Sequence, residues 1–193
     1  MASTGMEQES RNRLIRRATQ LFSERGFHVV SIGQIVGASD DLRSAMQRNF
    51  RSKEQLVQAV LEQRYDDILG SIAQRLKAVP DPVSKLEAIF GWYGDWFRTP
   101  EFSGCLFERA LSEFGVDAAG ISDVSIRYRS TLQNQMADLL RALIPHARAM
   151  RLAATYMMLL HGATTAARAH GAPEVAHHAW QSAHALLNEA KRD

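Results

Sequence analysis

The sequence predicts an all-α protein of about nine helices. Apolar residues recur at steps of three and four positions through most of the chain, which is the spacing of one helix face. We find no segment that alternates apolar and polar residues as a half-buried strand does. Glycine and proline interrupt the helical pattern at Gly26, Pro80, Pro100, Gly115, Pro145 and Gly171. With 193 residues, 46% of them hydrophobic, the chain is long enough to bury a core.

The first helix is expected to run from Arg11 to Gly26, after a loose polar arm at residues 1–8. Its apolar face is formed by Leu14, Ile15, Ala18, Leu21 and Phe22. Gly26 is the predicted stop, because glycine readily takes the conformation that follows a last helical turn.

Two short helices are expected next. Ser31 is placed to cap the second helix by accepting a backbone N–H. Residues 39–41, Ser-Asp-Asp, are predicted to form the turn, and residues 42–49 the third helix. A three-helix unit of this size in front of a longer helical chain is typical of a DNA-reading head.

The remaining chain reads as a helical body. Ser52 is expected to cap a long fourth helix that ends at Pro80. Five further helical patterns cover residues 82–98, 104–115, 120–144, 146–170 and 172–190. The boundary between head and body is expected at about residue 52.

Positive charge is concentrated in the head. Residues 1–53 hold nine Lys and Arg against five Asp and Glu, whereas acids are in excess in the rest. This distribution favours a polyanion as the partner of the head, although solvated helix faces are often equally basic.

Several protein classes are excluded or disfavoured. Cys105 is the only cysteine, which excludes an intrachain disulfide and a cysteine-rich zinc finger and favours the cytoplasm. No apolar run reaches 18 residues and no secretion signal opens the chain, so we expect no membrane segment. Because catalytic triads, P-loops and dinucleotide-binding turns are absent, we expect no enzyme, no cofactor and no metal site.

The head resembles the TetR family of one-component transcriptional regulators. The matching residues are Leu14-Ile15-x-x-Ala18-x-x-Leu21-Phe22-x-x-x-Gly26-Phe27, then Ser31-Ile32-x-x-Ile35, then Phe50-x-Ser52-Lys53-Glu54-x-Leu56. The body is similar to a subset of the family through Gly104-Cys105-Leu106-Phe107 and Glu113-Phe114-Gly115. The resemblance implies a helix-turn-helix DNA-binding domain at residues 1–52 and an effector-binding and dimerisation domain at residues 53–193.

The resemblance also implies where double-stranded operator DNA is bound. On the third helix, Arg43, Ser44, Gln47 and Arg48 offer groups for bases or phosphates, although any short surface helix shows a polar face. Lys53, at the start of the fourth helix, resembles the family's phosphate contact, and Ser31 is either a second such contact or a pure cap.

The turn departs from the family pattern. Asp40-Asp41-Leu42 stands where a Gly-Val-Ser type of sequence is usual, and Gln47 stands where an aromatic residue is usual. The acid pair either repels phosphate or caps the third helix, and we expect capping, because Leu42 reads as an anchor on a formed helix.

An effector pocket is placed in the body by the resemblance. Its expected lining is aromatic, methionine-rich and sparsely polar: Trp92, Tyr93, Trp96, Cys105, Phe107, Tyr128, Met136, Met157 and His161. For each of these residues taken singly, a place in the core is the commoner role. Cys105 is expected to be a small core residue and not a redox sensor.

The family also implies a homodimer, which we expect to form through residues 146–190. Apolar stripes at helical steps occur there, at Leu152, Met158 and Leu159 and at Ala176, Trp180, Ala183 and Leu187. The favoured hypothesis is a repressor that a small, largely apolar or aromatic effector releases from its operator. The alternative is a dimeric ligand-binding or protein-interaction module that has lost specific operator binding.

Overall fold

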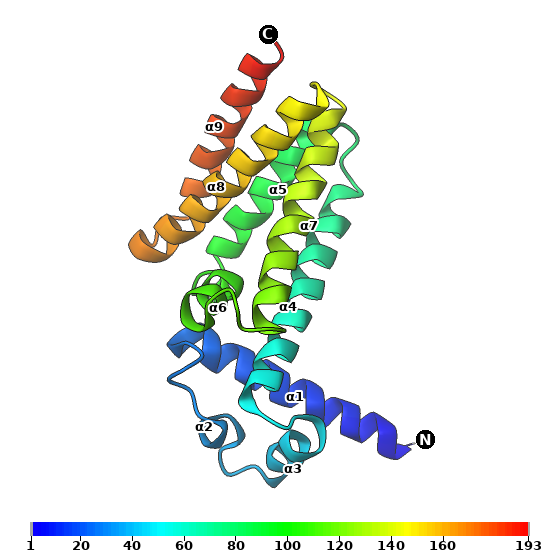
Figure 1. The fold of residues 1–193 in the computed structure, drawn as a ribbon, viewed down its shortest axis with the longest axis vertical. Coiled ribbons are helices and arrows are strands. Elements are labelled where there is room, and N and C mark those ends of the chain that lie inside the picture. The colour runs from blue at the N-terminus through cyan, green and yellow to red at the C-terminus, as the bar shows by residue number, and fades with distance from the viewer. Residues whose placement is uncertain (1, 193) are drawn as a thin grey trace. The chain divides into compact units, whose positions relative to one another are not determined.

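The computed structural model describes residues 2–192 and the side chains of residues 5–192. Within that range the chain forms nine α-helices and no strand (Figure 1). The helices are α1 (Ala2–Arg25), α2 (Ile32–Val36), α3 (Asp40–Asn49), α4 (Lys53–Leu76), α5 (Pro82–Phe97), α6 (Leu106–Phe114), α7 (Ile121–Arg141), α8 (His146–His170) and α9 (Val175–Ala190). The predicted all-α fold is confirmed.

The chain divides into two compact units. The first comprises Met1–Asp66 with Cys105–Ile126, and the second comprises Asp67–Gly104 with Arg127–Asp193. The chain passes between the units inside α4, between Gly104 and Cys105, and inside α7, so α6 belongs to the first unit. The expected boundary at residue 52 divides the proposed DNA-binding residues from the proposed effector-binding and dimerisation residues. The first packing unit extends beyond this boundary, because it also contains α6 and the first half of α4.

The first unit is built on α1, and the predicted start of this helix was wrong. Helix α1 begins at Ala2, and no loose arm precedes Arg11 in the described residues. Two side-chain pairs lie near the predicted start at Arg11: Gln8 binds Asn12 at 3.1 Å, as expected for residues four apart on a helix, and a Glu9 oxygen lies 2.8 Å from an Arg16 nitrogen. The predicted stop is confirmed, because the helix ends at Arg25 and Gly26 has a φ of 96°.

Helix α3 also begins earlier than predicted. The cap is Ser39, whose side chain accepts a hydrogen bond from the backbone N–H of Leu42 at 3.3 Å. The turn is therefore residues 37–39, and Asp40 and Asp41 already lie in the first helical turn. The expectation that the acid pair caps this helix is corrected.

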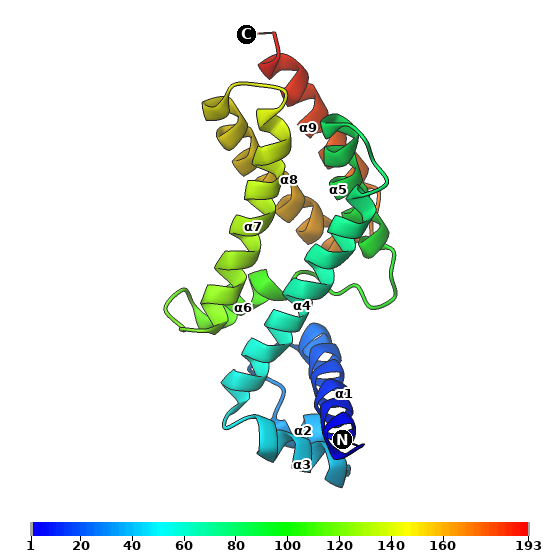
Figure 2. The same cartoon turned by 90° about the vertical axis from the view of Figure 1, so that its right-hand side faces the viewer.

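In the second unit, α5, α8 and α9 pack side by side (Figures 1 and 2). The ring of Trp180 on α9 lies 5.6 Å from that of Phe90 on α5, and Tyr156 on α8 donates to the carbonyl of Ala183 at 2.7 Å. A Cβ at Gly94 of α5 would lie 3.3 Å from Ala176, so the α5 and α9 backbones approach closely.

This packing corrects the apolar stripe that was assigned to the dimer interface. Ala176, Trp180, Ala183 and Leu187 are buried within the same chain, because α5 and α8 cover them. The apolar periodicity correctly identified which face of α9 is buried. It did not show that the helices covering this face belong to the same chain. Among the described helices, we find none with the length and hydrophobicity that crossing a bilayer requires.

Candidate nucleic-acid interface

Helices α2 and α3 form the helix-turn-helix, and both begin with a side-chain cap. At α2, the hydroxyl of Ser31 accepts from the N–H of Gln34 at 3.2 Å, and the Gln34 side chain accepts from the N–H of Ser31 at 2.8 Å. This reciprocal pair is a capping box. Ser31 therefore serves as a cap, and its hydroxyl hydrogen remains a donor for a phosphate oxygen.

One face of α3 is buried and the other carries polar side chains. Ala45 and Met46 are buried, whereas Arg43, Gln47 and Arg48 are exposed. Arg43 is held loosely, with donors 3.4 Å from the carbonyl of Gly37 and 3.5 Å from Asp40. Three of the four α3 residues proposed for DNA contact thus share an accessible surface.

The other polar residues of α3 are less available. Ser44 is half-buried. The amide of Asn49 donates to the carbonyl of Ala45 at 2.8 Å, so it is turned back onto its own helix. Gln47 and Arg48 make no side-chain hydrogen bond within the described part of the chain, which leaves their donors open to a base or a phosphate.

Asp41 anchors α3 to α1. One carboxylate oxygen lies 2.6 Å from Arg13, and the other accepts from the hydroxyl of Ser10 at 2.7 Å. Ser10 is buried. The negative charge of Asp41 is thereby balanced by Arg13, whereas the side chain of Asp40 is 94% exposed. The two acids, adjacent in sequence, therefore have different roles.

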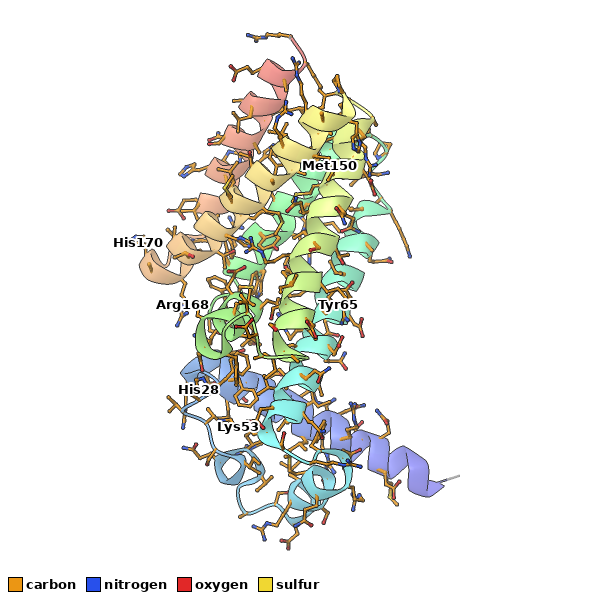
Figure 3. All side chains as sticks on the ribbon, in the orientation of Figure 1. His28, Lys53, Tyr65, Met150, Arg168 and His170 are labelled. Atoms are coloured by element: carbon orange, nitrogen blue, oxygen red, sulfur yellow. The ribbon has the colours of Figure 1, made fainter. Side chains whose placement is uncertain are left out.

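Lys53 opens α4 beside the loop that joins α1 to α2. Its Nζ donates to the backbone carbonyl of His28 at 3.2 Å, and Figure 3 shows the two labelled residues close together. Ser52 caps α4 as predicted, by accepting from the N–H of Gln55 at 3.3 Å. A hydrogen bond with the Ser52 side chain, aided by the backbone N–H of Glu54, holds the pKa of Glu54 below its usual value.

Helix α6 contacts the same region, which the sequence had not indicated. The guanidinium of Arg109 donates to the carbonyls of Phe22 at 2.8 Å and Ser23 at 2.9 Å, at the end of α1. The carboxylate of Glu113 accepts from the backbone N–H of His28 at 2.8 Å, across a sequence separation of 85 residues. No local pattern predicts a contact at that separation.

The residues proposed for an effector pocket are divided between the units. Cys105 and Phe107 belong to the first unit, and the other seven belong to the second. In the second unit the rings of Trp92, Tyr93 and Trp96 lie 5.2 to 5.9 Å apart. The hydroxyls of Tyr93 and Tyr128 are hydrogen-bonded at 2.7 Å in the interior.

The remaining proposed lining is partly core and partly polar. Met136 and Met157 are buried. Nδ1 of His161 lies 3.0 Å from a guanidinium nitrogen of Arg129. Because arginine only donates, Nδ1 of His161 accepts in this pair.

Cys105 immediately precedes α6 and is half-buried. Desolvation raises the pKa of the Cys105 thiol to about 11, and the nearby carboxylate of Glu108 acts in the same direction. A protonated thiol is a poor nucleophile, which favours a structural role for this residue. Among the residues with described side chains, no group of three His, Cys, Asp or Glu is arranged to hold a metal ion.

A capped short helix, a three-residue turn and a second helix with an exposed polar face, all supported by α1, define a helix-turn-helix head of the kind found in transcriptional regulators. Residues 14–60 match the family model described as bacterial regulatory proteins, tetR family. The head, residues 14–60, thus matches the TetR family, and its resemblance to that family is confirmed.

Curated relatives match parts of the chain. The HTH-type transcriptional repressor DhaR of Mycobacterium sp. (strain GP1) is 28% identical over 116 residues, which are 59% of this chain and 54% of that protein. The HTH-type transcriptional repressor KstR2 of Mycolicibacterium smegmatis is 30% identical over 80 residues, 42% of this chain and 39% of that protein. The chain thus spans about half, or less, of the length of these relatives.

Solved structures match nearly the whole fold. A TetR-family transcriptional regulator from Streptomyces coelicolor superposes with a TM-score of 0.88 at 23% identity, covering 96% of this chain and 98% of that one. A TetR-family regulator from Agrobacterium tumefaciens gives 0.80 at 22% identity, covering 95% and 98%. At these identities the likeness establishes the fold.

Proposed function

We propose that the protein is a homodimeric, ligand-responsive repressor that binds operator DNA with α3 of each head in a major groove. The observation that carries the proposal is the exposed polar face of α3, where Arg43, Gln47 and Arg48 lie together. Two relatives that match parts of the chain are named repressors, whereas a third, FasR of Mycolicibacterium smegmatis, is named an activator. The family assignment supports DNA binding, and the two repressors favour repression.

Each proposed DNA contact follows from the chemistry of its side chain. Arg43 and Arg48 supply paired donors for guanine or phosphate, and the amide of Gln47 can donate to and accept from adenine. Ser31 and Lys53, each at the start of a helix, supply donors for phosphates, which position the head without reading sequence.

We place the dimer interface on the outward faces of α8 and α9, within residues 146–190. Met158 on α8 is 63% exposed, which is unusual for a large apolar side chain. Thr155, Gly162 and Thr165 lie at helical steps from it and are exposed or partly exposed, and α8 carries no Asp, Glu, Lys or Arg between Thr155 and Thr165. Two copies paired about a two-fold axis through such faces would present two heads to half-sites roughly 34–36 Å apart.

The proposed effector is a small, largely apolar or aromatic molecule bound in the body. The cluster of Trp92, Tyr93 and Trp96, with the hydroxyl pair of Tyr93 and Tyr128, supports a site for a flat ligand that carries few polar atoms. Such a ligand releases DNA only when it binds the DNA-incompetent state more tightly than the competent one.

The alternative function is a ligand-binding or interaction module without operator binding. The exposed carboxylate of Asp40, on the first turn of the proposed recognition helix, favours it because a free anion there opposes phosphate. Asp41 no longer favours it, because Arg13 balances its charge.

The test is binding to genomic fragments that the wild-type protein selects, compared with scrambled duplexes over a range of salt concentrations. A regulator loses affinity linearly in log salt, with a slope of roughly −0.9 for each phosphate neutralised, and prefers the selected fragment. We expect Arg43→Ala and Arg48→Ala each to weaken that preference by roughly fivefold or more. Lys85→Ala on α5 is the control with the same charge change. Binding without salt dependence or preference would establish the alternative.

A further inference from the structure

The last turn of α6 contacts the loop between α1 and α2 through hydrogen bonds and through aromatic rings. The carboxylate of Glu113 accepts from the backbone N–H of His28 at 2.8 Å, and Nε2 of His28 lies 2.7 Å from the backbone carbonyl of Glu113. The ring of Phe114 lies 4.6 Å from the imidazole of His28 and 5.6 Å from the ring of Phe27. His28 is thus held by a hydrogen bond from its backbone N–H, by a hydrogen bond of its imidazole Nε2 and by packing of its ring against Phe114.

Gly26 makes this approach possible. Its φ of 96° is a conformation that favours glycine. A Cβ at this position would also lie 2.7 Å from the Oε1 atom of Glu113, inside van der Waals contact. Gly26 therefore ends α1 and leaves room for the carboxylate from α6, and only the first of these roles is visible in the sequence.

Arg109 fixes α6 to α1 one turn earlier. Its two hydrogen bonds, to the carbonyls of Phe22 and Ser23, satisfy acceptors that the end of α1 leaves open. A cation at a helix C-terminus is also favoured by the helix dipole. Because α6 is held by Arg109 and Glu113 together, the position of its last turn against His28 is well defined.

Lys53 also contacts His28, because its Nζ donates to the backbone carbonyl of His28 at 3.2 Å. Glu113 and Lys53 therefore hold opposite ends of one residue, the N–H and the C=O of His28. An ammonium group has three donors, so two remain for a phosphate while the third binds His28.

We propose that Glu113 and His28 are positioning residues that hold the Lys53 ammonium ready for a DNA phosphate. The inference rests on the proposed function, in which Lys53 contacts the DNA backbone. A lysine held in place before binding loses less rotamer freedom when the phosphate arrives, which strengthens the contact. A change at the end of α6 alters phosphate affinity through these two residues without altering the base-reading face of α3.

The experiment measures binding of the full-length protein to a mixed-sequence DNA duplex over a range of salt concentrations. The variants are Lys53→Ala, Glu113→Ala, Glu113→Gln and the double variant Glu113→Ala/Lys53→Ala. Ser112→Ala, exposed on the same helix, is the matched control. His28→Ala removes only the contacts made by the imidazole and keeps the backbone hydrogen bonds of residue 28. If circular dichroism shows that Glu113→Ala does not fold, His28→Ala still tests the proposal.

We expect Lys53→Ala to weaken binding about tenfold and to reduce the salt slope by about one. Glu113→Ala should weaken binding by roughly threefold in the wild-type background and not at all in the Lys53→Ala background. Glu113→Gln, which keeps an oxygen acceptor for His28, should bind as the wild type does. His28→Ala should show a smaller loss of the same kind, again only when Lys53 is present.

Losses that multiply in the double variant would overturn the proposal, because Glu113 would then act independently of Lys53. An unchanged slope and affinity for Lys53→Ala would overturn it as well, while leaving DNA binding by the protein intact. Wild-type binding that does not respond to salt would instead refute the proposed function.

Discussion

Replacing Asp41 by serine should destabilise the head, because the carboxylate joins α3 to α1. The change removes the 2.6 Å ion pair with Arg13 and replaces the acceptor of the 2.7 Å hydrogen bond from Ser10. Both partners of the ion pair are about half exposed, so it contributes only about 0.5 kcal/mol. The hydrogen bond from the buried Ser10 to a charged acceptor contributes about 1.5 kcal/mol. The first-turn position of Asp41 on α3 adds about 0.3 kcal/mol through the helix dipole.

The expected loss for Asp41→Ser is therefore about 2 kcal/mol in the free energy of unfolding, or a melting temperature lower by roughly 4–8 °C for a chain of this size. Thermal melts followed by circular dichroism in about 0.15 M salt measure it. Asp40→Ser is the matched control, because that carboxylate is 94% exposed and only 3.5 Å from Arg43, and we expect a change within roughly 0.5 kcal/mol. An Asp41→Ser protein that melts with the wild type and binds DNA much more tightly would refute the anchoring role.

Three further predictions concern the body and α6. Met158→Asp should convert the proposed dimer to monomer in sedimentation without unfolding it, and a dimer that survives would move the interface elsewhere. Trp180→Ala should lower the free energy of unfolding by about 3–5 kcal/mol, because the Trp180 side chain lies in the core of its own chain. If the variant were instead monomeric and as stable as the wild type, Trp180 would belong to the dimer interface. Cys105 should react slowly with thiol reagents at pH 8, since its pKa of about 11 keeps it protonated. Because the unfolded thiol ionises first, near its ordinary value of 9.0, Cys105 should also reduce stability as pH rises from there towards 11, which Cys105→Ala should abolish.

Local signals predicted the ends of several helices well. Ser31 and Ser52 cap the helices that they were expected to cap, and Gly26 ends α1, because each of these effects depends on a few neighbouring residues. The start of α3 was placed two residues late, since Ser39, Asp40 and Asp41 are all competent caps and sequence alone does not rank them.

Interactions between distant segments were not predictable in this way. The stripe of Ala176, Trp180 and Ala183 showed that one face of α9 is buried, but the same pattern serves an intramolecular and an intermolecular partner. Asp41 pairs with Arg13, and Glu113 with His28, only because the fold brings these distant segments together. No sequence motif marks either pair. Arg43, Gln47 and Arg48, proposed to contact DNA, share one exposed surface mainly because they lie on one short helix.

The inclusion of α6 in the first unit has a consequence for building chimaeric regulators. A head exchanged between two family members at residue 52 would lose Arg109 and Glu113 and receive an α6 selected for another α1. The side chain that fills the space beside Gly26, where a Cβ at residue 26 would lie 2.7 Å from the Oε1 atom of Glu113, would then be a foreign one. A functional exchange therefore has to carry residues 105–126 together with residues 1–66, as two separate stretches of the donor sequence.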